Sequence, residues 1–275
     1  MNSYLSRRFS DLFRMLSVCA LAWISASAVP VHAAPDLTSG GKLAAGIEYV
    51  VPPFIAGSKV RTPEGIDTLL VDDLARRLSA EAKTVRTDPS SPSRLLDEGK
   101  AKLLLVPVAN ADSFPHFAAI IPTGYSAGAM AIMRTDTDIK KWEDLKGRTV
   151  CLAEGGQYPG QMAARYGAVE KVFKAPADSL LALRTGGCDA AVHDSTMLTA
   201  LLQLPEWKKF SARLPVQDVA PLAFVIPAKD AESVSFLTKV AKEWANSRYL
   251  EKITKSAVND IAFEVYLDQT VTDCH

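Results

Sequence analysis

From residue 41 onward, short apolar runs bounded by glycine or proline alternate with longer amphipathic stretches. Runs such as KLAAGIEYV (42–50), RTVCLAEG (148–155) and CDAAVHD (188–194) predict strands, because they are short, apolar and flanked by turn residues. The stretch DTLLVDDLARRLSAEA (67–82) sorts into an apolar and a charged face and predicts a helix. Strands that alternate with helices are typical of βαβ units, so the pattern predicts an α/β fold with mainly parallel sheets.

A polar and charged stretch at 135–148 divides this alternation into two series. After it, a second series of strands and helices begins, which predicts a second βαβαβ unit. The amphipathic stretch 230–258 predicts a long helical region with a break near Asn246 and Ser247. Asp230, Ser233 or a neighbour is the candidate N-cap, since a short polar side chain can accept the free amide hydrogens of a helix start.

The first 34 residues have the features of a secretory signal peptide. Arg7 and Arg8 precede an apolar run that ends in small residues before position 35. A retained membrane anchor is the alternative, but the run is short of the roughly 18 apolar residues that a membrane span needs. The segment 1–34 therefore predicts a protein exported to the periplasm.

The charge balance excludes one class of partner. The chain has 31 basic and 31 acidic residues, and 28 and 30 remain without the three arginines and one aspartate of the signal segment. Nucleic-acid binding depends on clustered positive charge, which the sequence lacks. No metal-spaced His/Cys cluster, Ser-His-Asp order or nucleophile elbow occurs either, so we expect no metal, no cofactor and no catalysis.

Three stretches, in order, resemble one known family. GKLAAGIEYVVPPF (41–54), WEDLKGRTVCLAEGG (142–156) and LRTGGCDAAVHDSTML (183–198) are similar to motifs of the bacterial extracellular solute-binding protein family 3. These are the periplasmic amino-acid-binding components of ABC importers. The resemblance implies a monomer that captures a small polar ligand, such as an amine, an amino acid or a derivative, and delivers it to the importer's membrane subunits.

The resemblance also implies a fold and its division. The fold is the two-lobed periplasmic binding protein type 2 fold, in which two mainly parallel sheets are joined by two crossing strands. Here the crossing strands would be 126–133 and 221–228. Lobe 1 would comprise residues 35–127 plus 224–275, and lobe 2 residues 128–223. Open parallel sheets bind ligands at the carboxyl ends of their strands, which places the ligand between the lobes.

Asp194 is the first candidate for a ligand contact, because it ends a predicted strand. In the family, the matching aspartate holds the ammonium group of the ligand. The alternative is an ordinary turn or helix-cap aspartate.

A second candidate is the turn that follows the strand at 148–155. It consists of Gly155, Gly156, Gln157 and Tyr158. Its backbone amides could hold a carboxylate if a helix begins there, as the matching turn of the family does. A plain strand-to-helix turn needs glycine just as often.

Further candidates come from the first series. Glu48 follows the first strand, where a matching acid in some family members receives a cationic side chain; the alternative is a solvated strand-end charge. Four aromatic side chains are candidate walls or, equally, core residues. They are Tyr49, Phe54, Phe114 and Tyr125.

The family's carboxylate clamp is missing. The family holds the ligand carboxylate with an arginine shortly after a Ser-x-Thr element, but Ala109, Ala111 and Phe114 stand near those places, and no arginine occurs between Arg94 and Arg134. No neutral side chain replaces a bidentate guanidinium. His116 could pair with an anion or be a packed loop residue. The cleft therefore favours a cationic or weakly anionic ligand.

Cys151 and Cys188 are the candidate disulfide. They lie on or beside the first and third strands of the second series, which would be sheet neighbours, and a subset of the resembled family carries cysteines at these two places. Closing a loop of about 38 residues would add a few kcal/mol of stability. Two unpaired buried thiols are the alternative, and Cys274 is left over.

Two other functions stay open. Exported dehydratases resemble these binding proteins, and a dehydratase here would have only Glu48 or His116 as its acid or base. A homologue that lost its ligand and docks onto a partner protein is the other; the apolar residues in place of the clamp and the spare Cys274 motivate it.

Overall fold

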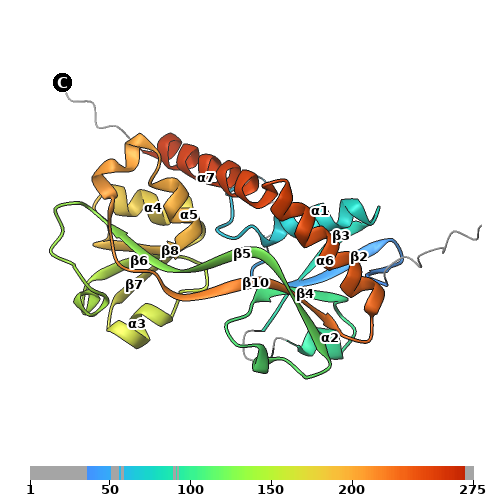
Figure 1. Ribbon diagram of the computed structural model, residues 1–275. Coiled ribbons are helices and arrows are strands. Elements are labelled where there is room, and N and C mark those ends of the chain that lie inside the picture. Colours follow the sequence, from blue (N-terminus) through green and yellow to red (C-terminus); the bar gives the residue numbers. More distant parts are fainter. Residues whose placement is uncertain (1–35, 51–55, 57–58, 89–90, 92, 270–275) are drawn as a thin grey trace, which may run out of the picture. The chain divides into compact units, whose positions relative to one another are not determined.

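The computed structural model describes the chain except residues 1–35, 51–55, 57–58, 89–90, 92 and 270–275 (Figure 1). The predicted signal peptide, Phe54 and Cys274 lie outside the described residues.

Strands and helices alternate along most of the chain (Figure 1). The strands are β1 Thr38–Ser39, β2 Lys42–Ile47, β3 Glu81–Arg86, β4 Leu103–Pro107, β5 Ala118–Met133, β6 Thr149–Ala153, β7 Val169–Phe173, β8 Ala190–Asp194, β9 Ala212–Arg213 and β10 Gln217–Pro227. The α-helices are α1 Asp67–Arg77, α2 Arg94–Asp97, α3 Gln161–Tyr166, α4 Pro176–Arg184, α5 Ser195–Leu201, α6 Ala231–Asn246 and α7 Tyr249–Asp268. Short 3-10 helices are η1 Ala111–Ser113, η2 Trp142–Leu145 and η3 Pro205–Phe210.

Two parallel groups of strands have the same arrangement. In the first group, β2 pairs in parallel with β3 on one side and β4 on the other. In the second group, β6 pairs in parallel with β7 and β8. The first strand of each series is therefore central, and the predicted α/β fold with mainly parallel strands is confirmed. The carboxyl ends of the parallel strands in each group lie at one sheet edge, where ligands bind in such folds.

The two groups are joined by β5 and β10, which run antiparallel to each other. β10 also pairs with β4, and β5 also pairs with β8, so a continuous hydrogen-bonded sheet passes from one group to the other. In Figure 1 both strands extend from one group of strands to the other. The predicted crossing strands, 126–133 and 221–228, lie in this pair.

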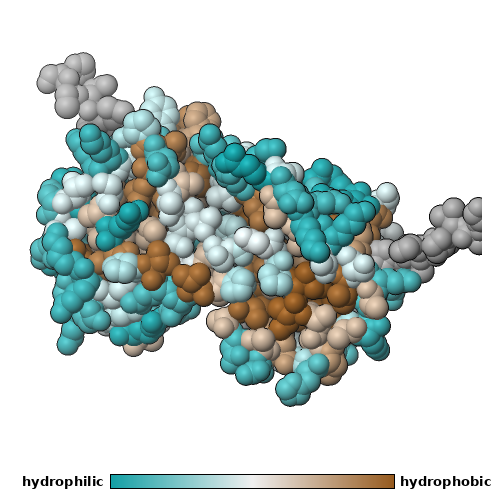
Figure 2. Space-filling view, viewed as in Figure 1, coloured by the Kyte–Doolittle hydropathy of each residue, from teal (hydrophilic) through white to brown (hydrophobic). Residues whose placement is uncertain are grey.

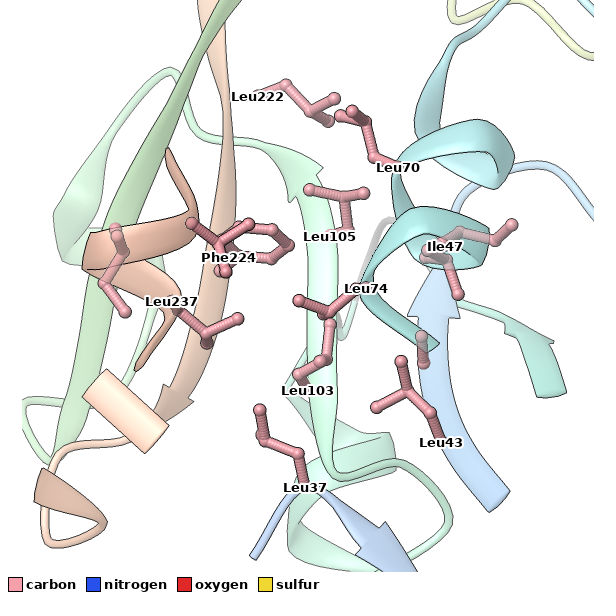
Figure 3. Packing of buried hydrophobic residues seen from close by; sticks show 14 of the residues in the cluster. Leu37, Leu43, Ile47, Leu70, Leu74, Leu103, Leu105, Leu222, Phe224 and Leu237 are labelled. Atoms are coloured by element: carbon pink, nitrogen blue, oxygen red, sulfur yellow. The ribbon is translucent and has the colours of Figure 1, made fainter. Parts of the chain in front are cut away.

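Each group of strands has its own apolar core. In the first, Leu70 and Leu74 of α1 meet Leu103 and Leu105 of β4, with Phe224 of β10 beside them (Figure 3). All five side chains are fully buried. Burial of one such side chain contributes about 1.5–3 kcal/mol, so this packing fixes α1 and the end of β4 at the sheet edge.

The core of the second group includes the last helix. Val258, Ile261 and Val265 of α7 pack with Leu180 of α4 and Leu198 of α5. Figure 1 shows α7 running past α4 and α5. The C-terminal half of α7 thus packs on helices of the middle segment, and the proposed lobe boundaries stay a prediction.

Most predicted elements are confirmed, with four differences. β3 was not predicted, because 80–82 was assigned to the preceding helix; α1 ends at Arg77, and Ser79 adopts a left-handed φ of 51° that turns the chain. β5 begins earlier than predicted and α7 continues to Asp268. α3 begins only at Gln161. The helix break near Asn246 and the Asp230 cap, whose side chain accepts from the Ser233 amide, are confirmed.

The predicted Cys151–Cys188 disulfide is present, with the two Cα atoms 5.8 Å apart. The register Cys151↔Ala191 places Cys188, which precedes β8, beside β6. The sulfurs lie in the core of the second group, so the bond joins two strands that already pair.

Hydrophilic residues cover much of the face seen in Figure 2, and hydrophobic side chains gather where β4 and the start of β5 lie. Within the described residues, none of the helices combines the length and the apolar character that crossing a bilayer requires.

The disulfide leads to a stability prediction. We expect the double variant Cys151→Ser/Cys188→Ser to melt roughly 5–15 °C lower than the wild type, because losing a cross-link over 37 residues of separation costs about 3–4 kcal/mol. Differential scanning calorimetry measures the difference. A reducing agent should lower the melting temperature of the wild type and leave that of the double variant unchanged. Peptide mapping under non-reducing conditions that finds the two cysteines unlinked would contradict the structure.

Candidate functional site

A small cavity lies at the carboxyl ends of the parallel strands of both groups. Its volume is about 50 Å³. Four of its lining residues are acidic, one is the polar Gln157, and the others are apolar, aromatic or small. The lining residues are Glu48, Tyr49, Glu64, Gly65, Ile66, Asp67, Leu105, Pro107, Tyr125, Ala127, Gly155, Gly156, Gln157, Asp194, Ala220 and Leu222.

The strand ends explain how three of the carboxylates meet. Glu48 directly follows β2, and Asp194 is the last residue of β8. Asp67 is the first residue of α1, where it accepts a hydrogen bond from the Thr68 amide at 2.9 Å. Carboxyl ends of parallel strands share one sheet edge, and a helix start favours negative charge. The fold therefore delivers these groups to one place.

The fourth carboxylate, Glu64, comes from the loop before α1. This loop is held by α4 and α7. Arg61 pairs with Asp178 of α4 at 2.7 Å and with Asp268 of α7. Thr62 donates to Glu264 of α7 from both its amide, at 2.9 Å, and its hydroxyl, at 2.6 Å. These contacts fix the backbone two residues before Glu64.

Glu64 contacts the end of β8 with both carboxylate oxygens. Oε1 accepts a hydrogen bond from the Asp194 amide at 2.8 Å, and Oε2 lies 3.0 Å from Nδ1 of His193. Since a carboxylate only accepts, Nδ1 carries the hydrogen in this contact. The side chain of Glu64 is buried, so these bonds compensate for the loss of its water contacts.

His193 also contacts α4, through Ser179. Its Nε2 lies 2.7 Å from the hydroxyl of Ser179, which donates to it when Nδ1 carries the hydrogen. The Ser179, His193 and Glu64 chain has the residue types of a hydrolase triad. Ser179 and His193, however, are completely buried, and neither lines the cavity. A substrate could not reach the hydroxyl, so the chain positions Glu64 and the end of β8.

The carboxylate of Asp194 accepts a hydrogen bond from the Tyr158 hydroxyl at 2.7 Å. Asp194 is also the N-cap residue of α5, but its side chain makes no capping hydrogen bond. The carboxylate thus does not perform the helix-cap role that was the alternative interpretation of this residue. Asp194 lines the cavity, and the hydrogen bond from Tyr158 fixes the position of its carboxylate.

The glycine turn after β6 lies against the other strand group. A Cβ atom at Gly155 would stand 2.8 Å from Cγ of Tyr49, and one at Gly156 would stand 2.6 Å from Oε2 of Glu64. Only glycine permits these close approaches. The Gly156 amide donates to the Ala153 carbonyl at 3.0 Å. Because α3 begins at Gln161, this turn does not sit at the start of a helix.

Burial changes the acidity of the cavity. Loss of water raises the pKa of Asp194 to about 7, with the charge of Glu64 adding to the effect. Burial and then the charge of Asp67 raise the pKa of Glu48 to about 7, and burial raises the pKa of Asp67 to about 6. Burial also raises the pKa of Tyr158 far above its usual range. Each shift reports that a negative charge here lacks compensation.

The remaining predicted site residues are placed as follows. Tyr49 and Tyr125 line the cavity, and Tyr125 is buried. Phe114 packs in a core cluster with Leu95 and does not line the cavity. His116 is exposed and lies outside the lining.

Sequence reasoning missed Glu64, Asp67 and His193. Asp67 carried a signal, since an acidic residue that opens a predicted helix after a loop is a common N-terminal feature. Glu64 and His193 carried none, because only the tertiary fold brings residues 129 positions apart into contact. Among the described residues, no group of three His, Cys, Asp or Glu side chains is arranged to hold a metal ion.

The raised pKa values lead to a pH prediction. A carboxyl group whose pKa is higher in the folded protein than in the unfolded chain stabilises the folded protein at low pH. That contribution is lost as the pH rises from the unfolded pKa to the folded pKa. We therefore expect the free energy of unfolding of the ligand-free protein to fall as the pH rises from about 5 to about 7.5. Urea unfolding at several pH values measures this slope.

The variant Asp194→Asn should flatten that slope, because it removes a group whose pKa is raised to about 7. Asp72→Asn is the matched control: Asp72 is exposed on α1 and should leave the slope unchanged. A slope that is the same in the wild type and in Asp194→Asn would contradict the proposed burial of this carboxyl.

No protein-family model matches the chain, and no curated protein matches its sequence. Solved structures do match. A mutant of ArgBP from T. maritima is 23% identical with a TM-score of 0.54, over 80% of this chain and 96% of that one. The ancestral cationic amino acid solute binding protein AncCDT-1 is 20% identical with a TM-score of 0.55, over 79% and 96%. AbpA, an amino acid ABC transporter substrate-binding protein from Streptococcus pneumoniae bound to L-arginine, is 18% identical with a TM-score of 0.54, over 80% and 96%.

These likenesses show the fold, which is that of the two-lobed periplasmic binding proteins. Structures that share it include amino-acid-binding proteins of ABC transporters. AncCDT-1 is also described as a precursor of cyclohexadienyl dehydratase, so both a binding protein and the ancestor of an enzyme are similar to this chain.

Proposed function

We propose that the protein is a periplasmic solute-binding protein that holds a small cationic ligand between two lobes and presents it to the membrane subunits of an ABC importer. One observation carries this proposal: the cavity is lined by Glu48, Glu64, Asp67 and Asp194, and its described lining includes no lysine, arginine or histidine.

The energetics favour a cation in this place. A buried carboxylate without a positive partner either protonates or is strongly destabilised. The raised pKa values of Glu48, Asp67 and Asp194 are the first of these responses. A bound ammonium or guanidinium group would lower these pKa values again, and that difference contributes to the binding free energy.

The ligand must change the cleft to enter. The cavity of about 50 Å³ is well below the roughly 150 Å³ that accommodates benzene in an engineered cavity. Glu48 and Tyr49 lie on one group of strands, and Asp194 and Gly155 on the other, so separating the groups would open the cavity. A ligand that contacts both groups would favour the closed state by population shift.

The proposal rests on several independent supports. The fold is that of proteins that bind solutes, and two of the similar structures are described as binding cationic amino acids or L-arginine. The segment 1–34 predicts export. The proposed division into residues 35–127 plus 224–275 and residues 128–223 would give each lobe one parallel strand group, with β5 and β10 as the connection.

A dehydratase is the second candidate, because Glu48 lines the cavity with a pKa near 7, where a general acid or base is effective. The dehydratase considered from the sequence acts on prephenate-like acids. An anionic substrate would be repelled by four carboxylates, and the cleft offers it no cationic side chain among the lining residues. We therefore propose that the protein binds its ligand without turning it over. If the purified protein turned over a prephenate-like acid, the dehydratase would become the first candidate.

The ligand class leads to a binding prediction. We expect amines and guanidines to raise the melting temperature of the mature protein, and dicarboxylates to leave it unchanged, because a ligand that binds the folded state stabilises it. The gain should be larger at pH 7.5 than at pH 5, where protons compete for Glu48 and Asp194.

The variant Asp67→Asn should weaken binding of such a cation about tenfold or more, since it removes a buried charge that faces it. Asp72→Asn, on the exposed side of the same helix, should bind as the wild type does. If none of the amines and guanidines shifts the melting temperature, the protein does not bind small cations. The better interpretation is then a homologue that lost its ligand and docks onto a partner protein.

A further inference from the structure

We propose that Glu64 stands in the place of a ligand carboxylate, so that the cleft selects an amine or guanidine that carries no carboxylate group and discriminates against amino acids. This inference rests on the proposed function and specifies the ligand of the same site. It comes from how the hydrogen-bond donors around the cavity are used.

A carboxylate in a binding cleft needs N–H donors. The donors near the end of β8 and the glycine turn include three that already have acceptors: the Asp194 amide, Nδ1 of His193 and the Gly156 amide. Glu64 accepts from the first at 2.8 Å and contacts the second at 3.0 Å. The third donates to the Ala153 carbonyl. The chain's own groups have already taken all three donors.

Glu64 also fills the space that a second carboxylate would need. Its Oε2 lies so close to the glycine turn that a Cβ on Gly156 would approach it to 2.6 Å. A ligand carboxylate placed against this turn would meet a like charge at contact distance, and this repulsion would weaken its binding.

The position of Glu64 is fixed from two sides. Arg61 and Thr62 bind the preceding loop to α4 and α7, through Asp178, Asp268 and Glu264. On the far side, His193 is itself held by Ser179 at 2.7 Å. A ligand would have to break this buried network to displace the Glu64 side chain, which is only 4% exposed.

The rest of the lining suits a carboxylate-free cation. Glu48, Asp67 and Asp194 offer negative charge, and the rings of Tyr49 and Tyr125 line the same cavity. A cation beside aromatic rings gains further attraction. The three carboxylates cannot compensate the negative charge of a ligand carboxylate.

Matched pairs of compounds test the inference directly. Arginine and agmatine, lysine and cadaverine, and ornithine and putrescine each differ by the carboxylate alone. Isothermal titration calorimetry at pH 7.5 gives a Kd for each compound with the mature protein. We expect at least one of the three amines to bind about tenfold or more tightly than its parent amino acid.

Three variants assign the discrimination to Glu64. Glu64→Ala removes both the charge and the occupying group. The ratio of the Kd of the amino acid to the Kd of the amine should therefore fall by about tenfold or more. Glu64→Gln keeps the shape and removes only the charge, and should shift the ratio in the same direction by less; it supplies the test if Glu64→Ala fails to fold. Glu143→Gln, exposed on η2, is the control and should keep the wild-type ratio.

The outcomes separate this inference from the function it rests on. If the wild type binds amino acids but none of the three amines binds more tightly than its parent amino acid, the inference is overturned and the solute-binding function stands. A ratio unchanged in both Glu64 variants would overturn the role of Glu64. Failure of all six compounds to bind would overturn the proposed function and, with it, the inference.

Discussion

The burial of carboxylates at the strand ends is the constraint on which the site and its surroundings depend. Each buried carboxylate loses its water contacts and must gain hydrogen bonds or a proton. The Glu64 carboxylate accepts hydrogen bonds from the Asp194 amide and from His193. The Asp194 carboxylate accepts one from the Tyr158 hydroxyl, and the Asp67 carboxylate accepts one from the Thr68 amide. The loop, the strand end and the glycine turn are arranged around these bonds, and the raised pKa values show that compensation is incomplete.

The strand topology explains why this charge collects in one place. Both parallel groups have their first strand in the centre, so the residues after β2 and β6 approach one another across the cavity. The contact of Tyr49 with Gly155 is the most direct result, and it is possible only because Gly155 lacks a side chain. β5 and β10 fix the orientation of both edges through backbone hydrogen bonds, and the buried disulfide holds β6 against the segment that precedes β8.

Much of the fold could be predicted from the sequence, because it depends on local periodicity. The strand at β8, the helix α1 and the break before α7 all carried clear apolar and polar patterns. β3 did not, because a short edge strand with charged residues has little apolar signal and continues a helix-like composition. The start of β5 and the length of α7 depend on partners far along the chain, and no local pattern records them.

Site residues at strand ends could be predicted from the sequence, and site residues in loops could not. Glu48 and Asp194 could be named from their strand-end positions, and Tyr49, Tyr125 and the glycine turn also reach the cavity. Phe114 carries the same residue type but packs in a core, since nothing local distinguishes an aromatic wall from a core residue. Glu64 depends on Arg61 and on a helix some 200 residues later, a relation that only the folded chain contains.

That relation has a practical consequence for handling the protein. Glu264 and Asp268, in the last two turns of α7, hold the loop that carries Glu64. The C-terminal end of the chain is therefore part of the support of the cleft, although it is remote from the cavity in sequence. A shortened chain that ends before Glu264 would lose the Glu264 contact of Thr62 and the Asp268 contact of Arg61, while the Asp178 contact of Arg61 would remain. An affinity tag or a fluorescent label is therefore better attached beyond the helix than within its last turns.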